Sequence, residues 1–173
     1  METDDYIFFY GHNPNKNGTE IYSQWYPSIF YEKLDNKMIK YYNAEQYMMA
    51  HKALLFEDFD SHEKIMKEIN PAKIKSLGRK IKNFDEDLWD DYKYDIVVSG
   101  NKLKFKQNPD LFKSLTKTGN KLLVEASPHD NIWGIGLSVN KAMILPKSKW
   151  PGKNLLGKAI TQVKNELNND LNV

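Results

Sequence analysis

The chain has 173 residues, 40% of them hydrophobic and 28% charged, which is the balance of a folded globular domain and excludes an intrinsically disordered protein. The formal net charge of +2 is too small for the overall field to attract nucleic acid, although a local cluster of cations could still bind an anionic small molecule. Because the sequence has no cysteine, disulfides, thiol nucleophiles and thiolate metal ligands are excluded.

The start of the chain does not match a targeting signal. Residues 1–5 are largely acidic and precede a short aromatic and aliphatic run, residues 6–10. A signal peptide needs a basic start and a longer apolar stretch, and a membrane helix needs about 20 apolar residues. We therefore expect a cytoplasmic (intracellular) protein with no membrane partner.

One strand is predicted near the N-terminus. Residues 6–10 favour a strand because aromatic and β-branched side chains dominate them. Residues 11–19 favour a loop because they are rich in Gly, Asn and Pro. The apolar residues 21–30 are interpreted as a short extended segment and a turn, since Pro27 interrupts them.

Helices are predicted next, from their capping residues. Asn43 is expected to cap a helix that runs to about residue 56, and Asp60 with Glu63 forms a predicted capping box for a second helix. Three further helix starts are expected at Asn70-Pro71, with an end near Gly78, at Asp85, and at Asn108-Pro109, with an end at Thr118-Gly119.

The long helix from Asp85 is predicted to pack through an apolar stripe. The stripe consists of Leu88, Trp89, Tyr92, Ile96 and Leu103, which recur at helical spacing. The stretch Lys104 to Lys106 is interpreted as an exposed face with one core contact, because Lys is usually solvated.

The last third mixes strands with a helix. Residues 122–126 are predicted to form a buried strand, the Gly-rich residues 132–139 another strand, and residues 154–168 an amphipathic helix. Helices and strands do not alternate regularly, and the sequence has no repeat or linker. We therefore predict an α+β fold, in which a single mainly helical domain of residues 1–173 surrounds a small sheet.

Three stretches place polar and aromatic residues together where a core would be apolar. They are residues 23–28 (SQWYPS), residues 43–53 (NAEQYMMAHKA) and residues 125–136 (EASPHDNIWGIG). In this order they resemble the S-N-x-Y-P-S-x-F, A/V-E-x-Y-x-x-x-x-K-A and E-A-S-P-x-D-x-I-W-G-I-G blocks of the NADAR (YbiA-like) family of N-glycosidases. Gln24 departs from the usual Asn, which keeps an amide but changes its reach.

Shorter segments extend the resemblance over nearly the whole chain. They match the L-G-R, F-x-x-x-x-W, K-F-x-Q-N-P and W-x-G-x-N-x-L-G patterns at residues 77–79, 84–89, 104–109 and 150–157. The resemblance implies hydrolysis of the C–N bond between ribose 5-phosphate and a base, most simply in ribosylamino-pyrimidine phosphates of riboflavin synthesis. It also implies a YbiA-like fold and a small-molecule ribosyl phosphate or nucleotide as partner, with no cofactor and no metal.

The resemblance assigns roles to nine residues. Glu45 and Asp130 are expected to be catalytic, since cleavage of the glycosidic bond builds positive charge on the sugar that a carboxylate can stabilise. Substrate contacts are expected from Trp25, Lys52, Arg79, Trp89, Glu125, Trp133 and Asn154, whose aromatic rings could stack on the base and whose cations could hold the phosphate.

Simpler interpretations stand beside these roles. By pattern alone, Glu45 is an exposed first-turn acid that suits the helix dipole, and Asp130 is a turn residue. Trp89 at helical spacing is a core residue by default, and Lys52 and Arg79 are solvated. Two other functions also remain: an ADP-ribosyl-guanine hydrolase, for which nucleic acid would be a partner only as ADP-ribosylated substrate, and a non-catalytic NAD or ADP-ribose binding module. The oligomeric state is open.

Overall fold

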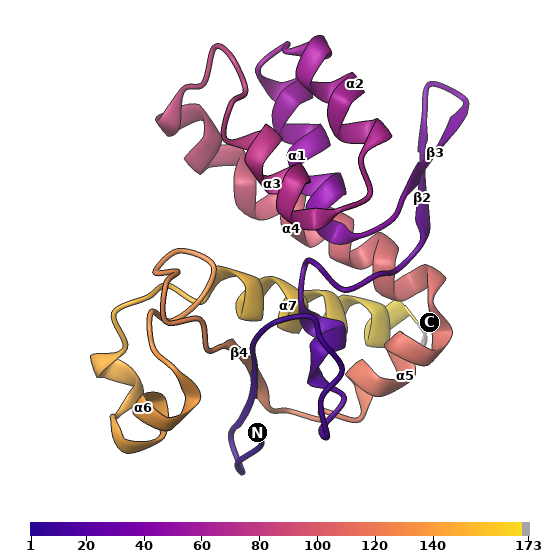
Figure 1. Cartoon of the computed structure of the whole chain (residues 1–173). Helices are drawn as coiled ribbons and strands as arrows, with labels where there is room; N and C mark the ends of the chain where they lie inside the picture. The colour runs from indigo at the N-terminus through magenta and orange to yellow at the C-terminus, as the bar shows by residue number, and fades with distance from the viewer. Residues whose placement is uncertain (171–173) are drawn as a thin grey trace. The chain divides into compact units, whose positions relative to one another are not determined.

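The computed structural model describes residues 1–170 and divides into two compact units. Unit 1 consists of residues 1–23 together with the chain from residue 110 onward, and unit 2 consists of residues 24–109. Each unit is described by itself (Figure 1). The idea that the chain works as one domain of residues 1–173 stays a prediction, and its last three residues lie outside the described part.

Unit 1 is organised by two parallel strands that are far apart in the sequence. Strand β1 (Tyr6–Phe9) pairs with β4 (Leu122–Glu125), so that Phe8 lies opposite Val124. Both side chains are buried in a core with Ala126, Ile135 and Ala142. Helix α7 (Leu155–Asp170) packs on β4 and covers the small sheet (Figure 1). The remaining elements are η1 (Thr19–Tyr22), α5 (Pro109–Thr116), α6 (Val139–Ile144) and η2 (Lys147–Lys149).

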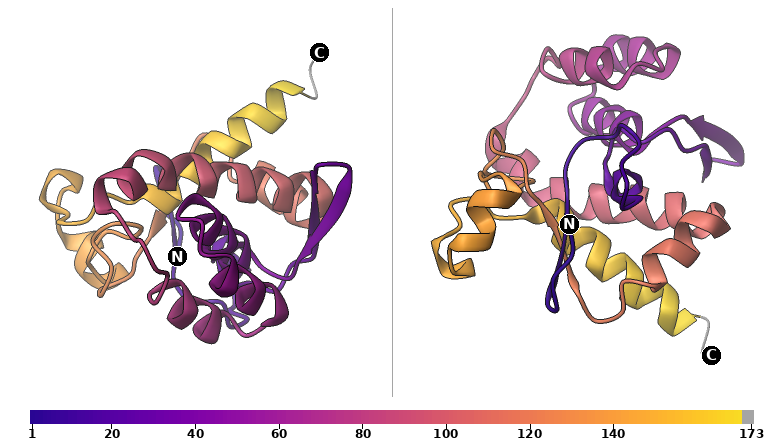
Figure 2. Two further views of the ribbon diagram at one scale, coloured as in Figure 1. Left: turned by 90° about the horizontal axis from the view of Figure 1, so that it is seen from above. Right: turned by 60° about the horizontal axis from the view of Figure 1, so that its bottom comes forward.

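Unit 2 is a hairpin followed by helices that pack around one central helix. Strands β2 (Phe30–Leu34) and β3 (Lys37–Tyr41) pair antiparallel through Asp35 and Asn36, whose φ angles of 44° and 64° match a two-residue hairpin turn. Helix α1 (Ala44–Leu55) then packs against α2 (Phe59–Lys67), α3 (Pro71–Gly78) and α4 (Glu86–Gln107). Figure 2 shows the turn end of the hairpin extending beyond these helices.

These elements confirm the predicted α+β class. Residues 1–170 contain seven α-helices and two sheets of two strands each. In this part of the chain no helix is both long and apolar enough to cross a membrane.

The helix starts depend on side-chain caps, and most of the predicted caps are confirmed. The side-chain oxygens of Asn43, Asn70 and Asp85 accept backbone N–H groups in the first turns of α1, α3 and α4. The predicted capping box at Asp60 is wrong. Asp58 caps α2 instead, because its carboxylate accepts the N–H of Ser61 at 3.1 Å while its second oxygen accepts the N–H of Lys82 at 2.9 Å.

The predicted strand at residues 132–139 is wrong. The backbone of this segment makes single bonds to the end of β4 and to the loop after it, since the N–H of Ile135 donates to the Glu125 carbonyl and that of Gly136 to the Asp130 carbonyl, at 2.9 and 3.0 Å. Gly134 also packs too closely for a side chain, because an added Cβ would lie 2.9 Å from the Glu125 carbonyl oxygen. The segment is therefore a tightly folded loop that leads into α6.

The buried face of α4 differs from the predicted apolar stripe. Trp89 is buried, but Leu88 and Tyr92 are exposed, and Lys104 is completely buried although an exposed face was expected there. Asn101 is also inside. Periodicity of apolar residues could not locate this face, because polar side chains occupy part of it.

We predict that Gly100→Ala destabilises the protein by roughly 1–3 kcal/mol through overpacking. A Cβ at residue 100 would lie 2.5 Å from Cδ1 of Tyr47, which is itself buried on α1. In an exposed helix the same change stabilises by about 1 kcal/mol, so packing decides the sign. Urea unfolding measures the free energy, with exposed Ser99→Ala as control. A Gly100→Ala protein as stable as wild type would contradict the tight α1–α4 contact.

Candidate active site

Helix α1 places two of the predicted residues on one face. Glu45 and Lys52 are seven residues apart, which is close to two helical turns, so their side chains leave α1 in nearly the same direction. Glu45 is only 6% exposed. The simpler interpretation of Glu45 as an exposed first-turn acid is therefore wrong. Because burial of a carboxylate is costly, a buried acid at this position favours a specific role.

Two aromatic rings lie beside the ammonium group of Lys52. Its Nζ lies 4.2 Å from the centroid of the Phe84 ring and 5.3 Å from that of Trp89, and donates to the Gly78 carbonyl at 3.1 Å. Burial lowers the pKa of Lys52 below its ordinary value. Lys52 and Trp89 are thus brought together, and Lys52 is not the solvated lysine that pattern alone suggested.

The end of α3 lies against the same helix. Gly78 lies against α1 so closely that an added Cβ would overlap the Met49 sulfur. Arg79 follows directly as the C-cap residue of α3 and is exposed. Gly78 and Phe84 were not among the predicted site residues, although both lie inside the segments that resemble the family.

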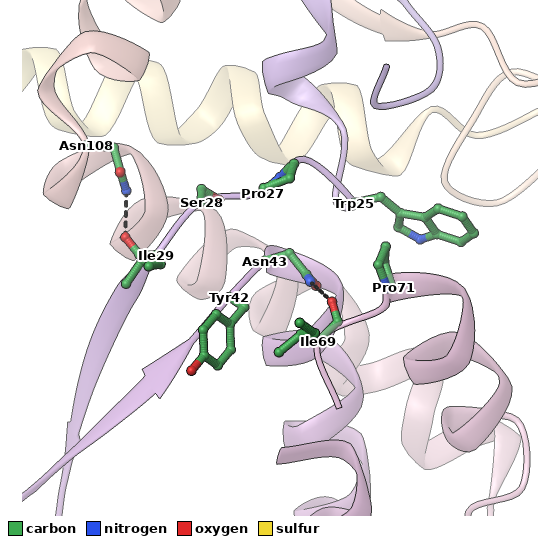
Figure 3. Close-up of a pocket in the computed structure, with 9 residues that line it drawn as sticks. All are labelled: Trp25, Pro27, Ser28, Ile29, Tyr42, Asn43, Ile69, Pro71 and Asn108. Carbon is green, nitrogen blue, oxygen red and sulfur yellow. Dashed lines mark hydrogen bonds between the residues drawn. The ribbon is translucent and has the colours of Figure 1, made fainter. Parts of the chain in front are cut away.

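Trp25, also in unit 2, lies on the wall of a pocket of about 570 Å³ (Figure 3). The pocket is lined by Trp25, Pro27, Ser28, Ile29, Tyr42, Asn43, Ile69, Pro71 and Asn108. Its two amides bind backbone carbonyls, since Asn43 Nδ2 donates to Ile69 at 3.2 Å and Asn108 Nδ2 to Ile29 at 3.1 Å. The walls are therefore mostly apolar and aromatic, and Lys52 and Trp89 are not among them.

In unit 1, Asp130 organises the loop that follows β4. Its Oδ1 accepts the N–H groups of Ile132 at 2.9 Å and of Trp133 at 2.8 Å. This is the behaviour of a turn-forming Asp. The same bonds set the backbone that carries half-buried Trp133, so the two predicted residues are close together.

Asn154 ties β4 to the start of α7. Its side-chain Oδ1 accepts the N–H of Glu125 and its Nδ2 donates to the carbonyl of Leu123, both at 2.9 Å. Its backbone has a φ of 53°, which Asn tolerates better than most residues. The structure thus places Asn154 in contact with the backbone of a second predicted residue, Glu125.

A cluster around Glu32 was not predicted. The hydroxyls of Tyr41 and Tyr47 donate to this carboxylate at 3.0 and 2.9 Å, and His51 Nε2 lies 2.9 Å from it. The only sequence signal was the spacing of Tyr47 and His51, one turn apart on α1. The partner Glu32 is on β2, and no short-range pattern connects it to α1.

Acid titration is expected to reveal this cluster. Burial alone would raise the pKa of Glu32, but the hydrogen bond and charge of His51 and the hydroxyls of Tyr47 and Tyr41 lower it below its ordinary value. A lowered pKa in the folded state contributes stability above the unfolded pKa of about 4.3, and this contribution disappears as the pH falls through the folded pKa. We predict that wild type loses more stability than Glu32→Gln between pH 6 and about 3. Thermal unfolding across this range measures the difference, and parallel curves would contradict it.

We predict that Asn154→Ala destabilises unit 1 by roughly 3 kcal/mol or more, because two buried backbone groups of β4 lose their partners. Ala also tolerates the positive φ poorly. Asn154→Gly loses the same hydrogen bonds but keeps the backbone conformation, so it is expected to be less damaging. Chemical unfolding measures all three proteins. A fully stable Asn154→Ala would show that the side chain is not needed for folding.

Comparisons with known proteins agree with the sequence motifs. Residues 8–168 match the NADAR domain family. The chain is 55% identical to "N-glycosidase R617" of Acanthamoeba polyphaga mimivirus, over 96% of this chain and 98% of that protein. It is 31% identical to the chloroplastic "Riboflavin biosynthesis protein PYRR" of Zea mays, over 72% of this chain but 19% of that protein.

A solved structure supports the fold. The NMR structure of the E. coli protein YbiA superposes with a TM-score of 0.76, covering 99% of this chain and 89% of YbiA at 23% identity. The similarity to a named N-glycosidase along the full chain identifies an N-glycosyl hydrolase. With residues 8–168 matched to the family, the chain belongs to the NADAR domain family.

Proposed function

We propose that this N-glycosyl hydrolase cleaves the C–N bond between ribose 5-phosphate and a base, and that ribosylamino-pyrimidine phosphates of riboflavin biosynthesis are its substrates. One observation carries the proposal: buried Glu45 shares a face of α1 with Lys52, whose ammonium group lies beside Phe84 and Trp89. The similarity to a plant riboflavin biosynthesis protein supports the choice of a pyrimidine.

The carboxylate chemistry is assigned first to Glu45. When the glycosidic bond breaks, positive charge develops on the ribose ring, and a carboxylate held in a site of low polarity stabilises that charge more strongly than one in water. The same group can orient the attacking water. Asp130 is assigned a second carboxyl role in the reaction on the basis of its motif.

The binding roles follow from side-chain chemistry. Lys52 and Arg79 are assigned to the phosphate, because cationic donors form strong hydrogen bonds with phosphate oxygens. Trp89 and Trp133 are assigned to the base, whose planar ring can stack on an indole. Trp25, Glu125 and Asn154 are assigned to further substrate contacts through their motifs.

We expect Glu45→Gln to lower kcat on ribosylamino-pyrimidine phosphate by on the order of 100-fold or more, because the amide removes the negative charge without changing the shape. Mass spectrometry of released ribose 5-phosphate and free base measures turnover. Glu63→Gln, an exposed position on α2, is the matched control and is expected to keep wild-type turnover.

The same assay separates the remaining functions. ADP-ribosyl-guanine DNA is offered in parallel, and release of ADP-ribose from it alone would replace the metabolite substrate by a modified nucleic acid. Saturable nucleotide binding without release of any base would favour a binding module. A folded Glu45→Gln protein with wild-type turnover would refute the catalytic assignment.

A further inference from the structure

A buried pair of amides lies next to the start of α1. Asn101 Nδ2, on α4, donates to Gln24 Oε1 at 2.8 Å, and the Gln24 side chain also lies 3.9 Å from the Met48 sulfur. Asn101 is 0% exposed and Gln24 is 9% exposed. The contact joins residues that are 77 positions apart in the sequence.

The backbone of Gln24 reaches the predicted catalytic residue. Its carbonyl accepts the N–H of Glu45 at 3.0 Å. Glu45 is in the first turn of α1, where backbone N–H groups have no acceptor within the helix. The position of the Gln24 carbonyl therefore influences where the first turn begins and where the Glu45 side chain leaves it.

The orientation of the Asn101 amide is fixed by its acceptors. Nδ2 donates to Gln24 Oε1 and also to the Val97 carbonyl at 2.8 Å, and a backbone carbonyl can only accept. As a result Oδ1 is buried and has no hydrogen-bond partner among the described residues. The cost of an unsatisfied buried oxygen is comparable with the net gain from a buried hydrogen bond. Stability alone is therefore a poor reason for this arrangement.

A close contact between α4 and α1 lies next to Asn101. Gly100 precedes Asn101 and lies against the ring of Tyr47, two residues after Glu45. Close packing at Gly100 limits movement of α4 along α1. The Asn101 amide therefore lies on a tightly packed part of α4, and its hydrogen bond can hold the Gln24 side chain in place.

We infer that Gln24 and Asn101 are positioning residues for Glu45: their amide–amide hydrogen bond holds the carbonyl that binds the Glu45 N–H and so sets the place of the carboxylate. The inference rests on the proposed role of Glu45. A displacement of about 1 Å can lower an enzymatic rate by about 100-fold, so loss of this support affects kcat more than KM.

The decisive variant removes both amides and keeps the shape. Gln24→Met with Asn101→Leu leaves no unsatisfied amide, so its thermal unfolding midpoint is expected within about 5 °C of wild type. Its kcat is nevertheless expected to fall by about 10-fold or more, with KM changed by less than about threefold. The acidic limb of its kcat–pH profile is expected to move, because the carboxylate loses its fixed environment.

A length exchange tests the hydrogen bond itself. Gln24→Asn and Asn101→Gln each change the reach by one methylene group and are expected to lower kcat, whereas the two together restore the reach and recover much of it. Gln107→Met is the control, because this α4 amide binds both backbone groups of Tyr31, at 2.9 and 2.7 Å, away from α1. It is expected to lower stability and leave kcat unchanged.

Glu45→Gln, measured alongside, separates the two proposals. If Glu45→Gln is inactive while the double variant Gln24→Met with Asn101→Leu is folded and has the wild-type kcat and pH profile, the positioning role is refuted and the catalytic role stands. If Glu45→Gln has wild-type turnover, both are refuted. The inference is supported if this double variant is stable but has a lowered kcat and the length exchange recovers kcat.

Discussion

Close packing of helices against α1 is the constraint on which unit 2 depends. Two glycines allow this close packing, since Gly78 at the end of α3 lies against Met49 and Gly100 within α4 lies against Tyr47. A Cβ at either position would overlap the facing side chain, so that side chain or the helix itself would have to shift, and packed interiors hold few voids that could absorb the change. These contacts hold α3 and α4 close to α1, the helix that carries Glu45 and Lys52.

Buried polar groups in unit 2 are joined to particular backbone groups. The Gln46 amide is an example, because its Oε1 accepts the N–H of Tyr42 at 2.9 Å while its Nε2 donates to the carbonyls of Ile65 and Glu68 at 3.1 and 2.8 Å. One side chain thus connects the end of β3, α1 and the end of α2. Such connections specify one arrangement of the chain more than they add stability, since the net gain per hydrogen bond is only about 1 kcal/mol.

In unit 1, side chains that bind backbone groups hold a loop in place. The segment after β4 has no regular secondary structure. The Asp130 side chain binds the backbone of this segment, and the Asn154 side chain binds the backbone of β4. Glycines allow the backbone to pass at distances that a Cβ would prevent, as at Gly134. A motif that looks catalytic by its residue types therefore also has a structural function, and the roles of its members in the reaction stay predictions.

Local signals in the sequence determined the class of the fold, most helix starts and the family. Caps at Asn43, Asn70 and Asp85 act within one turn, so a short window of sequence contains all of the information. Tertiary structure decided the rest. Lys104 is buried against the usual preference of lysine for water. The pairing of Glu32 with α1 and the hydrogen bond from Asn101 to Gln24 each join residues that are far apart in the sequence. Whether a polar side chain is buried depends on a partner that only the folded chain brings to it, and for that reason pattern and propensity could not predict these contacts.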